Sequence, residues 1–127
     1  MLFAEAATVH PDKTFSVLKA GIDRLIITPS NPGQQNMMMG ALIVRIRALP
    51  IDAGLHELGI ILLSEKNEEF GDLKIPRMAF EVPPEGRVQN SVVNIAGMQI
   101  PPVGRYSFKA LIDGIEAAQW PLEVLTQ

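Results

Sequence analysis

The sequence contains no cysteine, which excludes disulfide cross-links, thiolate nucleophiles and zinc sites with sulfur ligands. Aromatic residues make up only 6% of the chain, so the exposed aromatic platforms that bind sugars are disfavoured. The formal net charge is −3 at pH 7, and a phosphate backbone is held by clustered lysine and arginine. We therefore expect no nucleic-acid partner.

Long apolar runs are also missing. No run approaches the roughly 18 residues that a membrane span requires, and residues 1–9 carry neither a basic segment nor a cleavage signal. We expect a cytoplasmic protein that has no membrane partner.

Hydrophobic residues occupy 47% of the 127 positions, which is sufficient to form one core. We expect a single β-sandwich domain over residues 1–127. The recurring signal is an alternation of apolar and polar residues with period two, which is typical of strands. Turn residues separate the expected strands, which cover 3–9, 14–19, 22–28, 40–49, 56–64, 73–82, 87–96, 106–112 and a last run that ends at 125.

Several of these segments have a predicted place in a sheet. Residues 40–49 alternate as in a half-buried strand, whereas 56–64 are apolar on both faces and indicate an interior strand. Pro76 indicates an edge strand or a bulge. Turns at residues 10–13 and at Asp113-Gly114 predict two hairpins, whereas 29–33 and 97–104 read as loops.

The pattern favours an all-β fold, an antiparallel two-sheet β-sandwich of about 8–9 short strands, immunoglobulin-like or jelly-roll-like. Two alternatives remain open, a small closed barrel and a helical turn between residues 52 and 58.

The two ends of the chain resemble an uncharacterised bacterial β-sandwich family, a domain of unknown function. The first stretch runs from His10-Pro11-Asp12-Lys13 through to Gly21-Ile22-Asp23-Arg24-Leu25, and the second is Gly104-Arg105-Tyr106-Ser107-Phe108 followed by Asp113-Gly114. The resemblance implies the fold. It brings no activity, cofactor or site residue with it.

The candidates for chemistry are few. His10 and His56 could bind a metal ion together with Asp12 or Asp52, but a third nitrogen ligand is missing. The acidic residues at 65–72 lack the calcium-loop pattern, and neither a nucleophile elbow nor a phosphate-binding glycine loop occurs. We therefore predict no catalytic residue, no cofactor, no metal site and no enzyme activity.

A surplus of apolar residues lies on strands that otherwise read as half-buried, so one sheet is expected to be covered, by the loop at 31–39 or by a second copy of the chain. The function that follows is a non-catalytic protein-interaction or structural module whose partner is another protein or a homodimer. The alternative is a small-ligand-binding protein or enzyme with an unmarked pocket between the sheets, using Glu5, Asp23, Arg24 or Glu81 as buried polar groups. The candidate interface residues are Ile43, Ile61, Leu63 and Leu111.

Overall fold

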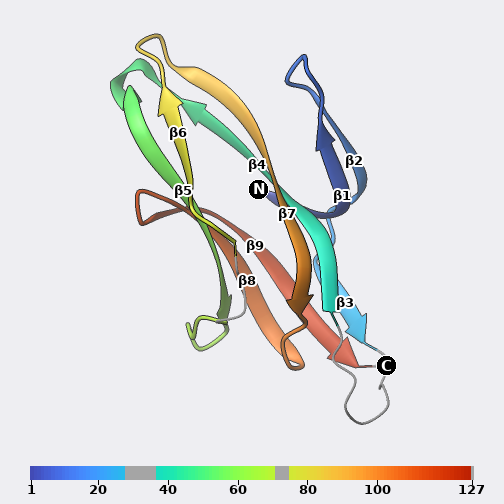
Figure 1. Ribbon diagram of the computed structural model, residues 1–127. Helices are drawn as coiled ribbons and strands as arrows, with labels where there is room; N and C mark the ends of the chain where they lie inside the picture. Colours follow the sequence, from blue (N-terminus) through green and yellow to red (C-terminus); the bar gives the residue numbers. More distant parts are fainter. Residues whose placement is uncertain (28–36, 71–74, 127) are drawn as a thin grey trace.

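The computed structural model describes residues 1–27, 37–70 and 75–126. These residues form nine strands and one short 3-10 turn (Figure 1). In chain order the elements are β1 (Leu2–Val9), β2 (Phe15–Ala20), β3 (Arg24–Ile27), β4 (Met37–Ala48), η1 (Pro50–Asp52), β5 (Gly54–Ser64), β6 (Met78–Val82), β7 (Arg87–Gln99), β8 (Gly104–Ile112) and β9 (Ile115–Thr126).

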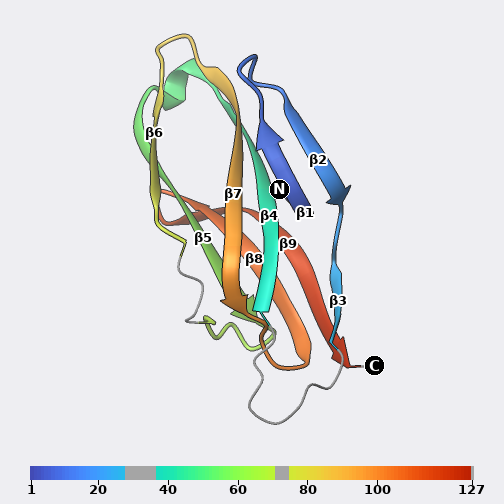
Figure 2. The ribbon, with the colours of Figure 1, turned by 45° about the vertical axis from the view of Figure 1, so that its right-hand side comes forward.

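The strands form two sheets, one of four strands in the order β2-β1-β4-β7 and one of five in the order β3-β9-β8-β5-β6. The five-stranded sheet is curled, and the two sheets face each other (Figure 2). One cluster of buried apolar side chains joins them, with Phe3, Leu42 and Val93 from the first sheet and Leu62 and Phe108 from the second. The expectation of an all-β, two-sheet fold is confirmed.

The prediction of purely antiparallel sheets is wrong at one strand. β3 pairs with β9 in parallel, with Arg24 opposite Glu123 and Ile27 opposite Thr126. The chain leaves the four-stranded sheet at the end of β2, passes Gly21–Asp23 and enters the other sheet. A parallel neighbour requires such a crossover, whereas a tight hairpin gives only antiparallel pairing.

The β1–β2 hairpin folds toward the outer side of β4 and β7. β1 pairs with β4 only from Leu2 to Ala4. Beyond that point it bends away, and the side-chain amide of Asn90 on β7 donates to the backbone oxygen of Lys13 at the hairpin tip, at 3.2 Å. Beneath the hairpin, Ile43 is only 3% exposed although it points away from the core. The segment that covers Ile43 is therefore the β1–β2 hairpin, which the sequence did not suggest. The loop at 31–39 had been expected to cover a sheet, and its residues 31–36 lie outside the described residues.

Most local predictions are confirmed. Both expected hairpins form, β5 lies between β8 and β6, and β6 is an edge strand that begins just after Pro76. The alternative of a helical turn between residues 52 and 58 is wrong, because β5 begins at Gly54, and the 3-10 turn of η1 lies before it and ends at Asp52. The predicted loop at 97–104 is shorter, because β7 continues to Gln99 after a bulge. The predicted loop at 29–33 lies outside the described residues.

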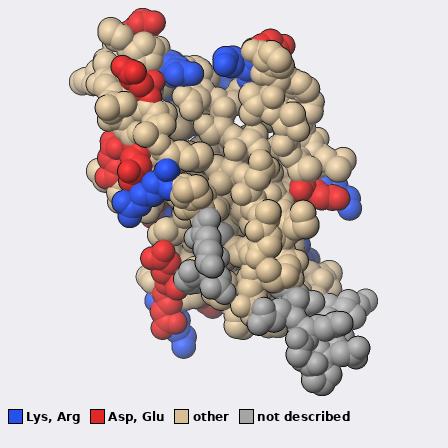
Figure 3. Space-filling view, viewed as in Figure 1, with Lys and Arg blue, Asp and Glu red and all other residues tan. Residues whose placement is uncertain are grey.

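Charged side chains do not mark one region of the described surface. Figure 3 shows them in small groups of mixed sign around the border of this face, with an uncharged middle. Exposed ion pairs of the described residues include Arg77 with Glu57 and Lys19 with Glu5. In the described part of the chain, no helix has the length and apolar character that crossing a membrane would need.

Candidate functional site

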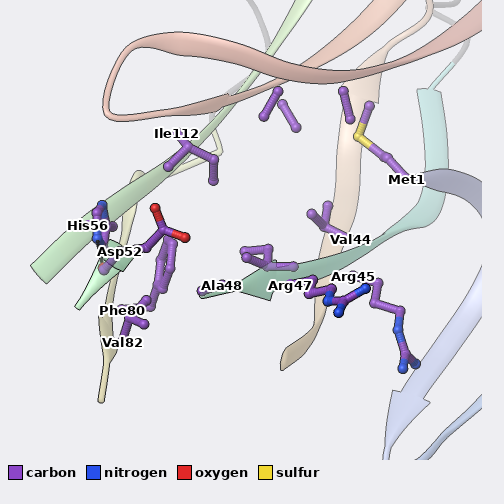
Figure 4. Close-up of a pocket in the computed structure, with 14 residues that line it drawn as sticks. Met1, Val44, Arg45, Arg47, Ala48, Asp52, His56, Phe80, Val82 and Ile112 are labelled. Carbon is purple, nitrogen blue, oxygen red and sulfur yellow. Dashed lines mark hydrogen bonds between the residues drawn. The ribbon is translucent and has the colours of Figure 1, made fainter. Parts of the chain in front are cut away.

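A cleft of 340 Å³ opens between the two sheets. Each sheet contributes one wall, and η1 contributes the end (Figure 4). Its lining is mainly aliphatic and alanine: Met1, Val44, Arg45, Ile46, Arg47, Ala48, Asp52, His56, Phe80, Val82, Ala110, Ile112, Ala117 and Ala118.

The walls follow from strand alternation and from small side chains. Val44, Ile46 and Ala48 take successive inward positions on β4, because side chains in a strand alternate between its two faces. Opposite them, Ala118 pairs with Ala110, and Ala117 is the extra residue of a bulge between β8 and β9. Alanines in place of larger residues leave the space between the sheets open.

His56 is held at the closed end of the cleft by three elements of the fold. Its Nδ1 lies 2.6 Å from the Oδ2 of Asp113, in the β8–β9 turn, and its Nε2 lies 2.6 Å from the backbone oxygen of Asp52, at the end of η1. The ring stacks on Phe80, with centroids 5.7 Å apart. Carboxylate and carbonyl oxygens only accept, so both contacts are hydrogen bonds at once only when both ring nitrogens carry a proton, as in the imidazolium.

The charges of this group support each other. The hydrogen bond that His56 donates to Asp113 raises the pKa of His56, and the hydrogen bond to the backbone oxygen of Asp52 adds to the effect. In return, the imidazolium lowers the pKa of Asp113, whose other oxygen accepts the backbone N–H of Glu57 at 2.9 Å. With both nitrogens engaged, the ring has no lone pair with which to accept a proton from a substrate.

Among the described residues that line the cleft, Asp52 is the one that carries a carboxylate. Its Oδ2 accepts the backbone N–H of Leu49 at 2.8 Å, which closes the 3-10 turn. Figure 4 shows its carboxylate directed into the cleft, whereas Arg45 and Arg47 point away from it on the far side of β4. The cleft therefore offers an apolar surface with one acceptor at its end.

The residues predicted as buried polar groups do not form this site. Glu5, Asp23, Arg24 and Glu81 are all exposed and none lines the cleft, so that part of the alternative hypothesis is wrong. All four lie on faces or edges where their charge reaches water, which avoids the cost of burial. The pocket that the same hypothesis required is present.

The two histidines have separate surroundings. His10 contacts the hydroxyl of Ser16 in the first hairpin at 2.6 Å, far from the contacts of His56. Asp52 reaches His56 through its backbone oxygen and not through its carboxylate. Within the described residues, no group of three or more histidine, aspartate or glutamate side chains is placed to hold a metal ion.

The candidate interface residues separate between the sheets. Ile61, Leu63 and Leu111 share the outer face of the five-stranded sheet and are partly buried, and Ile61 and Leu111 line a small groove of 170 Å³. Ile43 lies beneath the β1–β2 hairpin on the other sheet. The structure thus groups three of the four residues.

A family model covers residues 1–125 and describes a family of unknown function, DUF6941. The chain belongs to this family. The predicted resemblance to a family with no characterised activity is thereby confirmed. No curated protein and no solved structure matches this DUF6941 chain.

Sequence reasoning named His56 and Asp52 but missed Asp113 as the partner of His56. The contact joins residues 57 positions apart, and Asp113 was assigned only a turn role. The one available signal was that an Asp-Gly hairpin turn next to β5 leaves the aspartate side chain free to bond across strands. The cleft itself had no sequence signal beyond its alanines.

Proposed function

We propose that this DUF6941 protein is a non-catalytic protein-interaction module, built on a two-sheet β-sandwich, that binds an apolar side chain of a protein partner in the cleft. The observation that carries the proposal is the apolar cleft and its apolar surroundings. Ile51 is 89% exposed and Leu55 is 78% exposed, and they are chain neighbours of the cleft residues Asp52 and His56. A protein partner would cover such a rim, whereas a small ligand would occupy only the hollow.

The engaged state of His56 supports a non-catalytic role. The histidine at the cleft stabilises η1 and the β8–β9 turn through both ring nitrogens. General base catalysis requires a free nitrogen within hydrogen-bonding reach of the substrate. The same contacts make the ring a rigid end wall against which an inserted side chain can pack.

Selection of displayed random peptides on the protein tests this function. We expect selected peptides to share a large apolar anchor and to lose about tenfold or more in affinity when the cleft is filled by Ala117→Phe. Ala96→Phe is the matched control, because Ala96 is also an exposed strand alanine but lies outside the cleft lining. Both variants are first checked for the unfolding midpoint of the wild type.

Two results would count against the proposal. Selected peptides without a preference for apolar residues would show that the cleft is not the binding site. If Ala117→Phe and Ala96→Phe bound the selected peptides equally well, the cleft would again be excluded as their binding site.

A further inference from the structure

Half of β4 has no strand beside it on the side of the cleft. β1 pairs with β4 only through Leu2, Phe3 and Ala4, which lie opposite Ile43, Leu42 and Ala41. Farther along β4, residues 44–48 pair with β7 on one side, and no described strand pairs with them on the other. A strand paired on one side leaves the N–H and C=O groups of every second residue free on the other.

This free half-edge forms part of the cleft wall. All five successive residues from Val44 to Ala48 line the cleft, although their side chains alternate between the inner and outer faces. Outward-pointing Arg45 and Arg47 can line it only through atoms near the backbone, because Figure 4 shows their guanidinium groups directed away. The backbone edge of β4 is therefore accessible from the hollow.

The two faces of the half-edge differ in chemistry. On the inner side, Val44 and Ile46 meet the apolar walls of the cleft. On the outer side, Arg45 and Arg47 form no ion pair with a carboxylate of the described residues. Arg45 donates a hydrogen bond to the amide oxygen of Asn90, at 3.4 Å. An added strand would thus have apolar side chains on one face and would meet two cations on the other.

We propose that an extended segment of the partner protein adds as a strand to residues 44–48 of β4, with apolar side chains in the cleft and acidic side chains beside Arg45 and Arg47. This inference rests on the proposed function, since it names how the partner occupies the cleft. Strand addition at an exposed edge derives affinity from main-chain hydrogen bonds and specificity from alternate side chains. Five residues of strand span about 17 Å, which admits two or three inserted side chains.

The test uses a synthetic heptapeptide that alternates valine and glutamate, with its ends acetylated and amidated, titrated into the isotope-labelled protein. We expect saturable binding, and slower hydrogen exchange at those alternate amides of residues 44–48 that face the free edge. Replacing glutamate by lysine should weaken binding about tenfold, by like-charge repulsion. In the double variant Arg45→Gln and Arg47→Gln the two peptides should bind equally.

Backbone methylation separates strand addition from other modes of binding. In a ladder only alternate peptide N–H groups face β4, so methylating one alternate set should abolish binding and methylating the other set should leave it. Equal effects of the two sets, or no binding of the heptapeptide, would overturn strand addition. The proposed function would stand in either case if the selected peptides bind Ala117→Phe more weakly than the wild type. If they bind both equally well, the proposed function is wrong whatever the heptapeptide shows.

Discussion

Gly86 is the residue whose replacement should most directly disturb the wall of the cleft. It lies in the turn between β6 and β7 with φ at +82°. A β-carbon at this position would lie 2.7 Å from the backbone oxygen of Ala48 and 3.2 Å from Cδ of Pro50. Gly86→Ala would therefore combine an unfavourable backbone conformation with a collision against the end of β4.

Gly114 provides a matched control for the two effects. Its φ is +81°, almost the same, but a β-carbon there meets nothing within 4 Å. A left-handed conformation costs a non-glycine residue about 1–2 kcal/mol, and the reduced freedom of the unfolded chain returns about 0.4–1 kcal/mol. Gly114→Ala should thus lower the free energy of unfolding by about 1 kcal/mol. Overpacking adds about 1–3 kcal/mol, so Gly86→Ala should lower it by about 2–4 kcal/mol.

Urea unfolding followed by tryptophan fluorescence measures both variants. The chain has a single tryptophan, Trp120, whose indole N–H donates to the backbone oxygen of Ile22 at 2.7 Å in the folded state. If Gly86→Ala costs no more than Gly114→Ala, the β6–β7 turn is not packed against residues 48–50, and the reasoning about this wall is wrong.

Three further predictions concern the imidazolium, the core and the covered face. Because the pKa of His56 is raised above 6.5, its stabilising contribution is complete below pH 6.5 and is lost as pH rises through the raised pKa. Urea denaturation at a series of pH values should therefore show a free energy of unfolding that falls as pH rises through this range, and His56→Gln should remove this dependence. The pKa of Asp113 is lowered from 3.8, so its contribution is lost on acidification through that lowered pKa. The ring of Phe108 is fully buried and its centroid lies 5.4 Å from that of Phe3, so Phe108→Ala should lower the free energy of unfolding by about 3–5 kcal/mol. The control is Val103→Ala at an exposed position, which should stay within about 0.5 kcal/mol of the wild type. Ile43→Ala should cost about 2–5 kcal/mol and leave the solution mass by light scattering unchanged; a change in mass with little loss of stability would restore Ile43 to an interface.

The cleft contains one feature of β4 that the sequence pattern predicted and one that it did not. The alternation of residues 40–49 predicted which side chains of β4 face inward, and three of them form a wall of the cleft. It did not predict that residues 44–48 of the same strand pair with β7 on one side and with no described strand on the other. Alternation records how each face is buried and carries no information about which backbone edge is paired, because N–H and C=O groups are the same at every residue.

Ile43 illustrates a second limit. An apolar residue on an outward parity indicates that something covers it, but a partner molecule, a loop and a folded-over hairpin produce the same pattern. The contact between Asn90 and Lys13 identifies the hairpin as the cover, and it joins residues 77 positions apart. For Ile43 the expected cover is confirmed, and a distant segment of the chain provides it.

Side-chain period and turn residues, which act over a few positions, were enough to predict the short strands, their inward faces, the two hairpins and the all-β class. Four features follow from tertiary contacts instead. They are the parallel pairing of β3 with β9, the fold-over of the β1–β2 hairpin, the contact of His56 with Asp113 and the free half-edge beside the cleft. Each of these depends on which distant segments meet, and that choice is made by the burial of the whole core rather than by any one segment.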